Sequence, residues 1–453
     1  MQLDDELRSA LPTDFLRVWD EVGATGRIDV EFTYDESRPD PNETYQAVIT
    51  AHELGVRLKR FPWPLEHVTG QVIVTPTQVE LHEVCGRHED AKISLRGLYD
   101  RPTGAAQCSV RAENVSLDEP LRQAVPWRIR RSWNVIQPSG HVGLQLDRLL
   151  RHVDADGHVS WSCDGAIDLS GVSLESGIAV KDAFGHLEGG GRFGPEAAWS
   201  LEGQLALDRA TVKDHALTDV QCHVTKAQEP AVLDFVNVTA TVHGGRVMGQ
   251  VQVDLESGGG YDFSLVAQDM SLRPFLAAVA GADQVPESMH GRVQGTLYYT
   301  ARFDEPDRGR GGGELSVSGG NIFGTPLMLS VLGALNPIPP VGDYQDAALR
   351  FYLSRRQIDL HTIEIRDQSL VMTGSGVMNL PAKSLNVVLL VGEPTEENSP
   401  FTALPEFIQG ALRELVEIRI VGEAARPDIQ ARPLRGLDEA FRILTETRKG
   451  FHR

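Results

Sequence analysis

The residues best placed to do chemistry are the histidines and aspartates of the run His152-Val-Asp154-Ala-Asp156-Gly157-His158. Alternating aspartates before a glycine can begin a calcium loop, and histidines can hold a transition metal. No acidic residue follows at the position that an EF-hand loop requires, and Asp-Gly is a strong hairpin-turn signal. We therefore expect a hairpin turn here, with a metal site as the less favoured alternative.

Two arginine-rich segments are the next candidates. Arg128, Arg130 and Arg131 lie between Trp127 and Trp133, where they could contact phosphate head groups or another protein. A solvated loop is the interpretation that we favour.

The second segment, Arg308-Gly-Arg310-Gly-Gly-Gly313, resembles the repeats of nucleic-acid-binding tails. Because it falls between two predicted strands, we expect a flexible hairpin loop instead.

Signatures of catalysis are missing from the sequence. It has no Gly-x-Ser-x-Gly, no phosphate-binding or dinucleotide loop and no His-Glu-x-x-His. The carboxylate pairs Glu36/Asp40 and Asp304/Glu305 lie in predicted loops with nothing to tune them. A glycosidase with paired carboxylates on one strand face is not excluded by spacing alone. We expect no enzyme, no catalytic residue, no metal and no cofactor.

Composition narrows the class of partner. The chain has 453 residues and a net charge of −20, which argues against nucleic acid or an anionic membrane surface as its main partner. The four cysteines, Cys85, Cys108, Cys163 and Cys222, each fall in a predicted strand and are expected to be small buried hydrophobes. They show no zinc-site spacing, and they do not decide the compartment.

Membrane and export signals are also missing. No segment approaches the roughly 18 to 20 apolar residues of a membrane span. The sequence begins Met1-Gln-Leu-Asp-Asp-Glu-Leu, which is acidic and does not read as a signal peptide. The expectation is either a cytoplasmic protein or a piece of a longer product whose anchor lies elsewhere.

Strict alternation of apolar and polar residues between Gly291 and Leu380 predicts strands with one apolar face. Three consecutive strands are expected here, with breaks at 355–357 and 361–362. Their apolar members are Leu349, Phe351, Leu353, Ile358, Leu360, Ile363 and Ile365. Further upstream, short strands such as 159–163 and 166–169 are separated by glycine turns.

A repeated pattern suggests internal duplication. Residues 110–121 and 265–276 align without a gap, and each reads as a strand, a serine N-cap (Ser116 or Ser271) and a short helix. A glycine-started strand follows each, and a helix over residues 4–22, divided near Pro12, precedes a similar strand at Gly26. We predict three units, 1–107, 108–261 and 262–453.

The fold class that follows is mostly β, an elongated, curved antiparallel β-sheet groove of repeated short strands with a few short capping helices. A one-sided helix in the C-terminal region would cap the groove or dock on a partner. Its apolar residues are Leu404, Phe407, Ile408, Leu412 and Leu415.

The C-terminal 190 or so residues resemble the AsmA-like family, which includes TamB. The resemblance rests on the order of five features, none of them specific alone. They are Gly291-Arg-Val-Gln-Gly-Thr-Leu-Tyr-Tyr, Gly313-Glu-Leu-Ser-Val-Ser-Gly-Gly-Asn-Ile-Phe-Gly-Thr-Pro-Leu, the strand Leu349-Arg-Phe leading to Ile358-Asp-Leu, Gly374-Ser-Gly-Val-Met-Asn-Leu and Ile420-Val-Gly-Glu-Ala-Ala-Arg-Pro-Asp-Ile. The upstream residues match only through the repeat pattern.

This resemblance implies a bridge-like lipid transfer protein with an apolar groove, anchored in the inner membrane, spanning the periplasm and moving phospholipid to the outer membrane. The seven alternating residues, from Leu349 to Ile365, would line the groove. Phospholipid acyl chains, and an inner- or outer-membrane protein, would be its partners. The chain departs from the family pattern because it shows no N-terminal anchor helix.

Two rival functions remain. The sheet edges could receive strands of another protein, which would make the chain a structural assembly factor of the cell envelope. A β-solenoid that acts on polysaccharide is the other rival.

Overall fold

In the computed structural model the chain divides into two compact units. The described residues are 2–3, 13–34, 44–175, 178–194, 198–213, 215–256, 258–282, 285–335, 341–394, 415–424 and 426–434. The first unit takes residues 1–213, 219–236 and 253–259, and the second takes 214–218, 237–252 and 260–453. In the described part of the chain all 23 strands belong to one sheet, and few short helices accompany them. The prediction of a mostly β, antiparallel fold is therefore confirmed, while the three-unit division stays a prediction.

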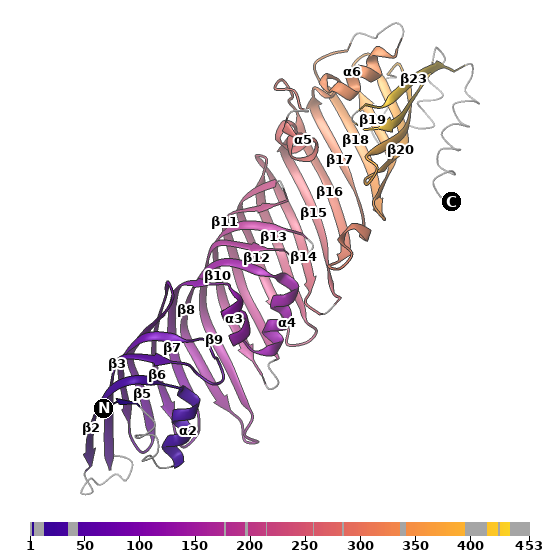
Figure 1. The fold of residues 1–453 in the computed structure, drawn as a ribbon. Helices are drawn as coiled ribbons and strands as arrows, with labels where there is room; N and C mark the ends of the chain where they lie inside the picture. Colours follow the sequence, from indigo (N-terminus) through magenta and orange to yellow (C-terminus); the bar gives the residue numbers. More distant parts are fainter. Residues whose placement is uncertain are drawn as a thin grey trace. The chain divides into compact units, whose positions relative to one another are not determined.

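In the first unit each strand pairs antiparallel with the next strand along the chain. Figure 1 shows these strands side by side in a curved sheet. The elements are β1 (Gln2–Leu3), α2 (Thr13–Val22), β2 (Thr25–Tyr34), β3 (Tyr45–Val56), β4 (Leu65–Val74), β5 (Gln78–His88), β6 (Ala91–Asp100), β7 (Ala106–Ser116), α3 (Glu119–Ala124), α4 (Trp127–Ile136), β8 (Pro138–Val153), β9 (Val159–Leu174), β10 (Val180–Phe193) and β11 (Trp199–Val212). Strands β12 (His215–Lys226), β13 (Val232–Val242) and β14 (Gly245–Asp254) contribute residues to both units.

The second unit continues the same antiparallel order from β15 to β23. Its elements are β15 (Gly260–Ser271), α5 (Leu272–Ala280), β16 (Arg292–Arg302), the 3-10 helix η4 (Pro306–Arg308), β17 (Arg310–Gly320), the 3-10 helix η5 (Ile322–Gly324), α6 (Pro326–Gly333), β18 (Gln345–Ser354), β19 (Gln357–Arg366), β20 (Val371–Asn379), β21 (Ser384–Gly392), β22 (Val416–Glu423) and β23 (Asp428–Pro433).

Some strands are longer than predicted. Residues 159–163 and 166–169 belong to one 16-residue strand, β9. The glycine between them, Gly165, is no turn: a Cβ there would lie 2.1 Å from the carbonyl oxygen of Gln145 on β8. Glycine serves here because it lets two backbones approach closely.

The predicted break at residues 361–362 is likewise a bulge within β19, so two strands replace the three that were expected. Phe351 pairs with Leu360 and Leu349 pairs with Ile363, with a register shift between the two pairs. Because of the extra residue, the apolar side chains in the second half of β19 point to the same face as those in the first half.

The repeated pattern has a local counterpart in backbone geometry. Gly26, Gly140 and Gly291, which open the three predicted glycine-started strands, have φ values of 118°, 105° and 128°. The aligned residues Asn114 and Asp269 both have φ of 56°. Such conformations strongly favour glycine and, less strongly, Asn and Asp.

The predicted serine caps are wrong in detail. Ser116 is the last residue of β7, and the N-cap of α3 is Asp118, whose carboxylate accepts a hydrogen bond from the Leu121 amide. Ser271 does occupy the N-cap position of α5, but its side chain makes no capping hydrogen bond. Propensity alone did not identify which polar residue would cap.

The largest core lies in the second unit, where α6 packs on strands β19 to β22. Ile418 and Met372 are fully buried from solvent, as is Val331 on α6. The cluster comprises Phe323, Met328, Val331, Leu332, Leu335, Ile365, Leu370, Met372, Val387, Leu389, Val391, Ile418 and Ile420. In the first unit the buried clusters are smaller, with three to five members each.

The predicted capping helix, with Leu404, Phe407, Ile408 and Leu412, lies outside the described residues. Leu415 is described, is buried and directly precedes β22. No helix in the described part of the chain is both long and apolar enough to cross a membrane.

We expect the α6-covered core to dominate the stability of the second unit. Ile418→Ala should lower the free energy of unfolding by about 2–5 kcal/mol, because it leaves a cavity in a fully packed region. Leu349→Ala, at a half-buried position on β18, should cost clearly less. Urea denaturation followed by circular dichroism measures both. Equal losses would contradict this view of where the packing lies.

Candidate functional site

The register of the strands assembles one continuous apolar face in the second unit. Directly paired residues of antiparallel strands point to the same side of a sheet, so a row of successive partners shows what that side carries. One row reads Leu265, Leu297, Gly313, Phe351, Leu360, Gly376, Val387, Ile420 and Ile429; the next reads Ala267, Gly295, Leu315, Leu349, Ile363, Gly374, Leu389, Ile418 and Ala431. Every member of both rows is apolar or glycine.

The opposite side of the same strands is mixed. A row there reads Ser264, Tyr298, Gly312, Tyr352, Asp359, Val377, Asn386, Val421 and Asp428. Along β16 the exposed residues Gln294, Thr296 and Tyr298 alternate with the less exposed Gly295 and Leu297. The sheet therefore has one apolar face and one water-facing face.

All seven predicted lining residues lie on the apolar face, but in two environments. Ile365 is buried in the core beneath α6, and Leu360 and Ile363 pack against that core. The other four, Leu349, Phe351, Leu353 and Ile358, are half-buried. The groove-lining role of the seven residues stays a prediction. Helix α6 covers the part of the apolar face that Leu360, Ile363 and Ile365 form.

The half-buried part of this surface extends from β15 to β18, and we call it the open apolar face. Its members share an apolar side chain of which part is still accessible to solvent. They are Phe263, Leu265, Leu297, Tyr299, Leu315, Leu349, Phe351 and Leu353. None of the eight is fully buried, in contrast to the strands under α6.

Glycines in β17 leave space on this face for the aromatic rings of the neighbouring strands. A Cβ on Gly313 would lie 3.2 Å from the Phe351 ring and 2.2 Å from the Thr296 carbonyl oxygen. A Cβ on Gly311 would meet the ring of Tyr299 at 2.8 Å. The prediction of a flexible loop for these glycines is therefore wrong, because they are strand residues that make room for neighbouring aromatic rings.

A corresponding apolar row crosses the first unit. It reads Val30, Ile49, Val72, Leu81, Gly97, Cys108, Leu149, Cys163, Gly191 and Leu201, with one residue from each of β2 to β11. Burial raises the pKa of the Cys108 and Cys163 thiols in this row. These two cysteines are small members of the apolar row, but they are half-buried rather than buried as the sequence predicts.

The other two cysteines differ from each other. Cys222 is buried, and this burial raises the pKa of its thiol to about 11. Cys85 is exposed on β5, so its predicted burial is wrong. It pairs with Thr69 and Ser94, which places it in a polar row.

A helical hairpin formed by α3 and α4 packs on the apolar face of the first unit. Leu121 and Ala124 of α3 contact a buried cluster that includes Ala112 and Val115 of β7 and extends to Leu144 of β8. Figure 1 shows both helices against one face of the strands. The sequence signal that could have found α4 is the helical spacing of Ile129, Trp133 and Ile136.

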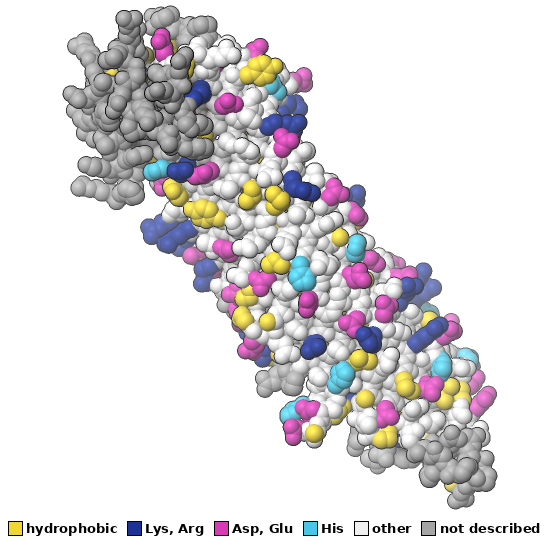
Figure 2. Space-filling view, turned by 180° about the vertical axis from the view of Figure 1, so that it is seen from behind, with side chains coloured by type: hydrophobic (Ala, Val, Ile, Leu, Met, Phe, Trp, Pro, Cys, Tyr) yellow, Lys and Arg dark blue, Asp and Glu magenta, His cyan; other side chains and the backbone are white. Residues whose placement is uncertain are grey.

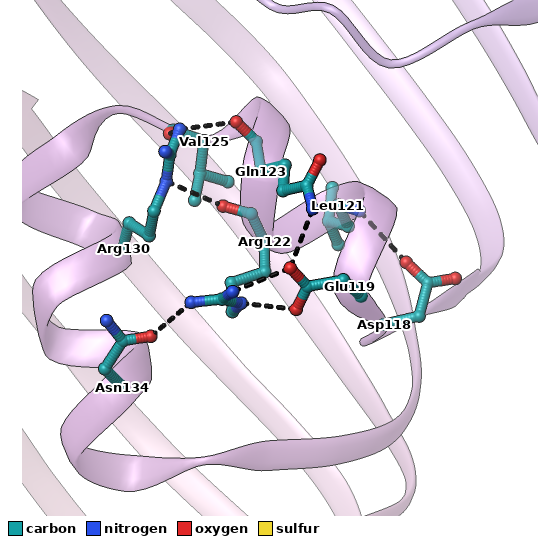
Figure 3. A network of polar contacts seen from close by, with 8 residues as sticks. All are labelled: Asp118, Glu119, Leu121, Arg122, Gln123, Val125, Arg130 and Asn134. Carbon is teal, nitrogen blue, oxygen red and sulfur yellow. Dashed lines mark hydrogen bonds and ion pairs between the residues drawn. The ribbon is translucent and has the colours of Figure 1, made fainter.

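Polar contacts lock the two helices together (Figure 3). The Arg122 guanidinium donates two hydrogen bonds of 2.6 Å to the Glu119 carboxylate and a third, also 2.6 Å, to the Asn134 side chain of α4. Arg130 of α4 donates to the carbonyl oxygens of Arg122, Gln123 and Val125. The Arg122 hydrogen bonds hold the pKa of the Glu119 carboxyl at about 2.

The hairpin also contacts loops that lie far along the chain. Arg128 pairs with Glu229, between β12 and β13, at 3.4 Å, and Arg131 pairs with Glu256, between β14 and β15, at 2.5 Å. At the other end of α4, the Ile136 carbonyl accepts a hydrogen bond from the Glu175 amide beyond β9. The arginines between the tryptophans are thus helix residues with internal partners, and the prediction of a solvated loop is wrong.

Lys226, the last residue of β12, is a buried cation in the first unit. Its Nζ donates to the carbonyl oxygens of Trp199 and Ala227, at 3.0 and 2.8 Å, and lies 4.4 Å from the Trp199 ring centroid. Burial lowers the pKa of the Lys226 ammonium. In the first unit, the α3–α4 hairpin thus covers part of the apolar face and is held there by hydrogen bonds and ion pairs.

The aspartate–histidine run forms the hairpin turn that the sequence predicts. Asp154 Oδ1 accepts hydrogen bonds from the Asp156 and His158 amides, at 3.0 and 2.8 Å, between β8 and β9. Ligand atoms of Asp154, Asp156 and His158 lie within 4.8 Å of one another, and all three residues are exposed. His152 is directed instead to Ser162, at 3.2 Å.

We expect the α3–α4 hairpin to loosen in acid. The pKa of Glu119 is lowered from its ordinary value of 4.5 to about 2. The bond between Glu119 and Arg122 therefore contributes fully to folding stability above pH 4.5, and this contribution is lost as the pH falls toward 2. Glu119→Gln should therefore destabilise the protein at pH 6, and the difference from the wild type should shrink below pH 4.5. Urea midpoints across this range measure it. Glu113→Gln, an exposed change on β7, is the control, and a constant difference at all pH values would contradict the assignment.

Comparison with protein-family models, with curated proteins and with solved structures finds no match to this chain.

Proposed function

We propose that the protein is a non-enzymatic binding protein for lipid acyl chains, which lie on the apolar face of its sheet. The observation that carries the proposal is the open apolar face of β15 to β18, where eight apolar side chains on four consecutive strands remain half-buried. Large contiguous apolar surfaces on water-soluble folds mark binding sites.

The energetics favour hydrocarbon as the occupant. Removing apolar surface from water is worth about 25 cal/mol per Å², or about 0.8 kcal/mol for each buried CH₂ group. A chain that leaves a bilayer for an apolar protein face exchanges one apolar environment for another, so the transfer is close to neutral. Because the rows contain no polar residue, an acyl chain can move across the strands without meeting a strong energetic barrier.

The finer proposal follows from the resemblance to the AsmA-like family. In that setting the face would be a segment of a phospholipid conduit in the cell envelope between the inner and outer membranes. The consecutive order of strands supports it, because each added strand extends the same apolar rows by one residue.

One observation favours the rival role of receiving a strand from another protein. Among the described residues, β1 pairs only with Gly26 and Arg27 of β2. Farther along β2, Phe32 and Tyr34 are 64% and 60% exposed. An apolar edge strand of this kind is a template for strand addition.

Lipid retention tests the proposal. Protein purified gently from a bacterial host should carry phospholipid that mass spectrometry detects. Leu297→Asp and Phe351→Asp should reduce the bound lipid several-fold, because each places a carboxylate on the open apolar face. Thr296→Asp is the matched control, since it lies next to Leu297 on the water-facing side. Ile363→Asp is less suitable because Ile363 packs against the α6 core.

Circular dichroism checks that each variant keeps its strands. Equal lipid content in the three variants would place the binding surface elsewhere. A lipid-free protein that takes up no fluorescent phospholipid would refute acyl-chain binding and favour the edge-strand role. Release of reducing sugar from a glycan panel would favour an enzyme acting on polysaccharide.

A further inference from the structure

An arginine-lined hollow lies at one end of strands β16 to β19. It has a volume of about 650 Å³ and is lined by Glu305, Arg308, Arg310, Arg355 and Arg356. Glu305 directly precedes the 3-10 helix η4, Arg308 ends that helix and Arg310 begins β17, while the β18–β19 turn supplies the other two. We call it the arginine pocket.

The charges around the arginine pocket are not balanced. Three arginines nearby have acidic partners: Arg302 with Asp304, Arg308 with Glu305 and Arg356 with Asp307. Arg310 and Arg355 are exposed and have no ion-pair partner within the described part of the chain. In a chain with a net charge of −20, this margin of the sheet, meaning the arginine pocket and the three ion pairs beside it, carries two more arginines than carboxylates.

The backbone holds two of these arginines in an unfavourable conformation. Ser354 pairs with Gln357, so Arg355 and Arg356 form a two-residue hairpin turn. Their φ values are 49° and 67°, in the region where Asn and Gly are the usual residues. This turn places two consecutive arginines beside the arginine pocket.

The arginine pocket adjoins the open apolar face. Tyr299, Gly311, Leu353 and Ile358 are paired in a row that carries apolar side chains and glycine. Arg355 lies two residues beyond Leu353, a path of about 7 Å at the usual strand rise. An amphiphile with its tails on the apolar face therefore has its polar end within reach of the guanidinium groups.

Exposed aromatic residues accompany Arg310 on the water-facing side. Tyr298, Gly312 and Tyr352 form one row, and the two tyrosines are 48% and 44% exposed. Arg310 lies two residues from Gly312 on the same side of β17. Figure 2 shows Lys and Arg side chains gathered at this margin beside large hydrophobic ones.

We propose that the arginine pocket binds a phosphate group, with Arg310 and Arg355 as its two uncommitted donors. Guanidinium groups match phosphate oxygens with paired N–H donors, and several around one hollow accommodate a tetrahedral anion. Glu305 lines the same hollow, but Arg308 pairs with it at 2.8 Å. The phosphate can belong to a lipid head group or be free in solution. The first source rests on the proposed acyl-chain binding, and the second does not.

The first arm of the test uses inorganic phosphate alone, titrated by calorimetry at low ionic strength. Saturable binding is expected, and the double variant Arg310→Gln/Arg355→Gln should weaken it at least about tenfold, because it removes two charge-assisted donors. The control, Arg192→Gln/Arg246→Gln, makes the same change of net charge on β10 and β14 and should bind like the wild type.

The second arm uses two lipids with identical tails, phosphatidic acid and diacylglycerol, presented in mixed micelles. Preferential loading of phosphatidic acid, lost in Arg310→Gln/Arg355→Gln and kept in the control, identifies a lipid head group as the occupant. Phosphate binding without any such preference identifies a free phosphate.

The outcomes separate the two proposals. If neither inorganic phosphate nor phosphatidic acid depends on the two arginines, the arginine pocket is not a phosphate site, whatever the tails do. If diacylglycerol and phosphatidic acid both fail to load, acyl-chain binding is refuted, and the calorimetric arm still decides the phosphate site. Because Arg310 and Arg355 are exposed, their replacement should leave the fold intact, which circular dichroism checks.

Discussion

Strand register is the constraint on which the rest of this structure depends. With a side-chain period of two, a slip by one residue would move all the apolar residues of a strand into water. The bulge in β19 shows the constraint at work, since it returns Ile363 and Ile365 to the side that carries Ile358 and Leu360. Register shifts recur elsewhere, beside left-handed residues such as Asn114 and Asp269, and they leave the apolar rows unbroken.

An apolar face made in this way must be covered or filled, and the protein treats its parts differently. Helix α6 seals the strands around Met372 and Ile418, which are completely buried. The α3–α4 hairpin covers part of the first unit and is tied down by hydrogen bonds and ion pairs rather than by hydrophobic contact alone. Between β15 and β18 the eight residues of the open apolar face stay half-buried, although Val293 and Met270 on the same strands are buried. This partial exposure is what distinguishes a candidate binding surface from a core.

The sequence predicted the apolar residues of these strands and their common face, because alternation reports directly on the side to which each residue points. It mispredicted Gly165 and Gly313, since glycine marks a turn and a close approach of two strands equally well. The arginines of α4 were also mispredicted. Their partners are far away in sequence, 101 residues in the case of Arg128 and Glu229, and no local pattern reveals such a contact.

The apolar rows and the charged margin would do different work in a lipid-binding protein. Acyl chains differ little from one another, so a surface made of leucine, phenylalanine and glycine can hold them but can hardly tell one lipid class from another. Selectivity has to come from polar groups at the ends of the strands, where head groups would lie. Because the chain as a whole repels anions, a local excess of uncommitted guanidinium groups is the feature there that can favour one. The apolar face would thus set whether a lipid stays, and the margin would set which lipid it is.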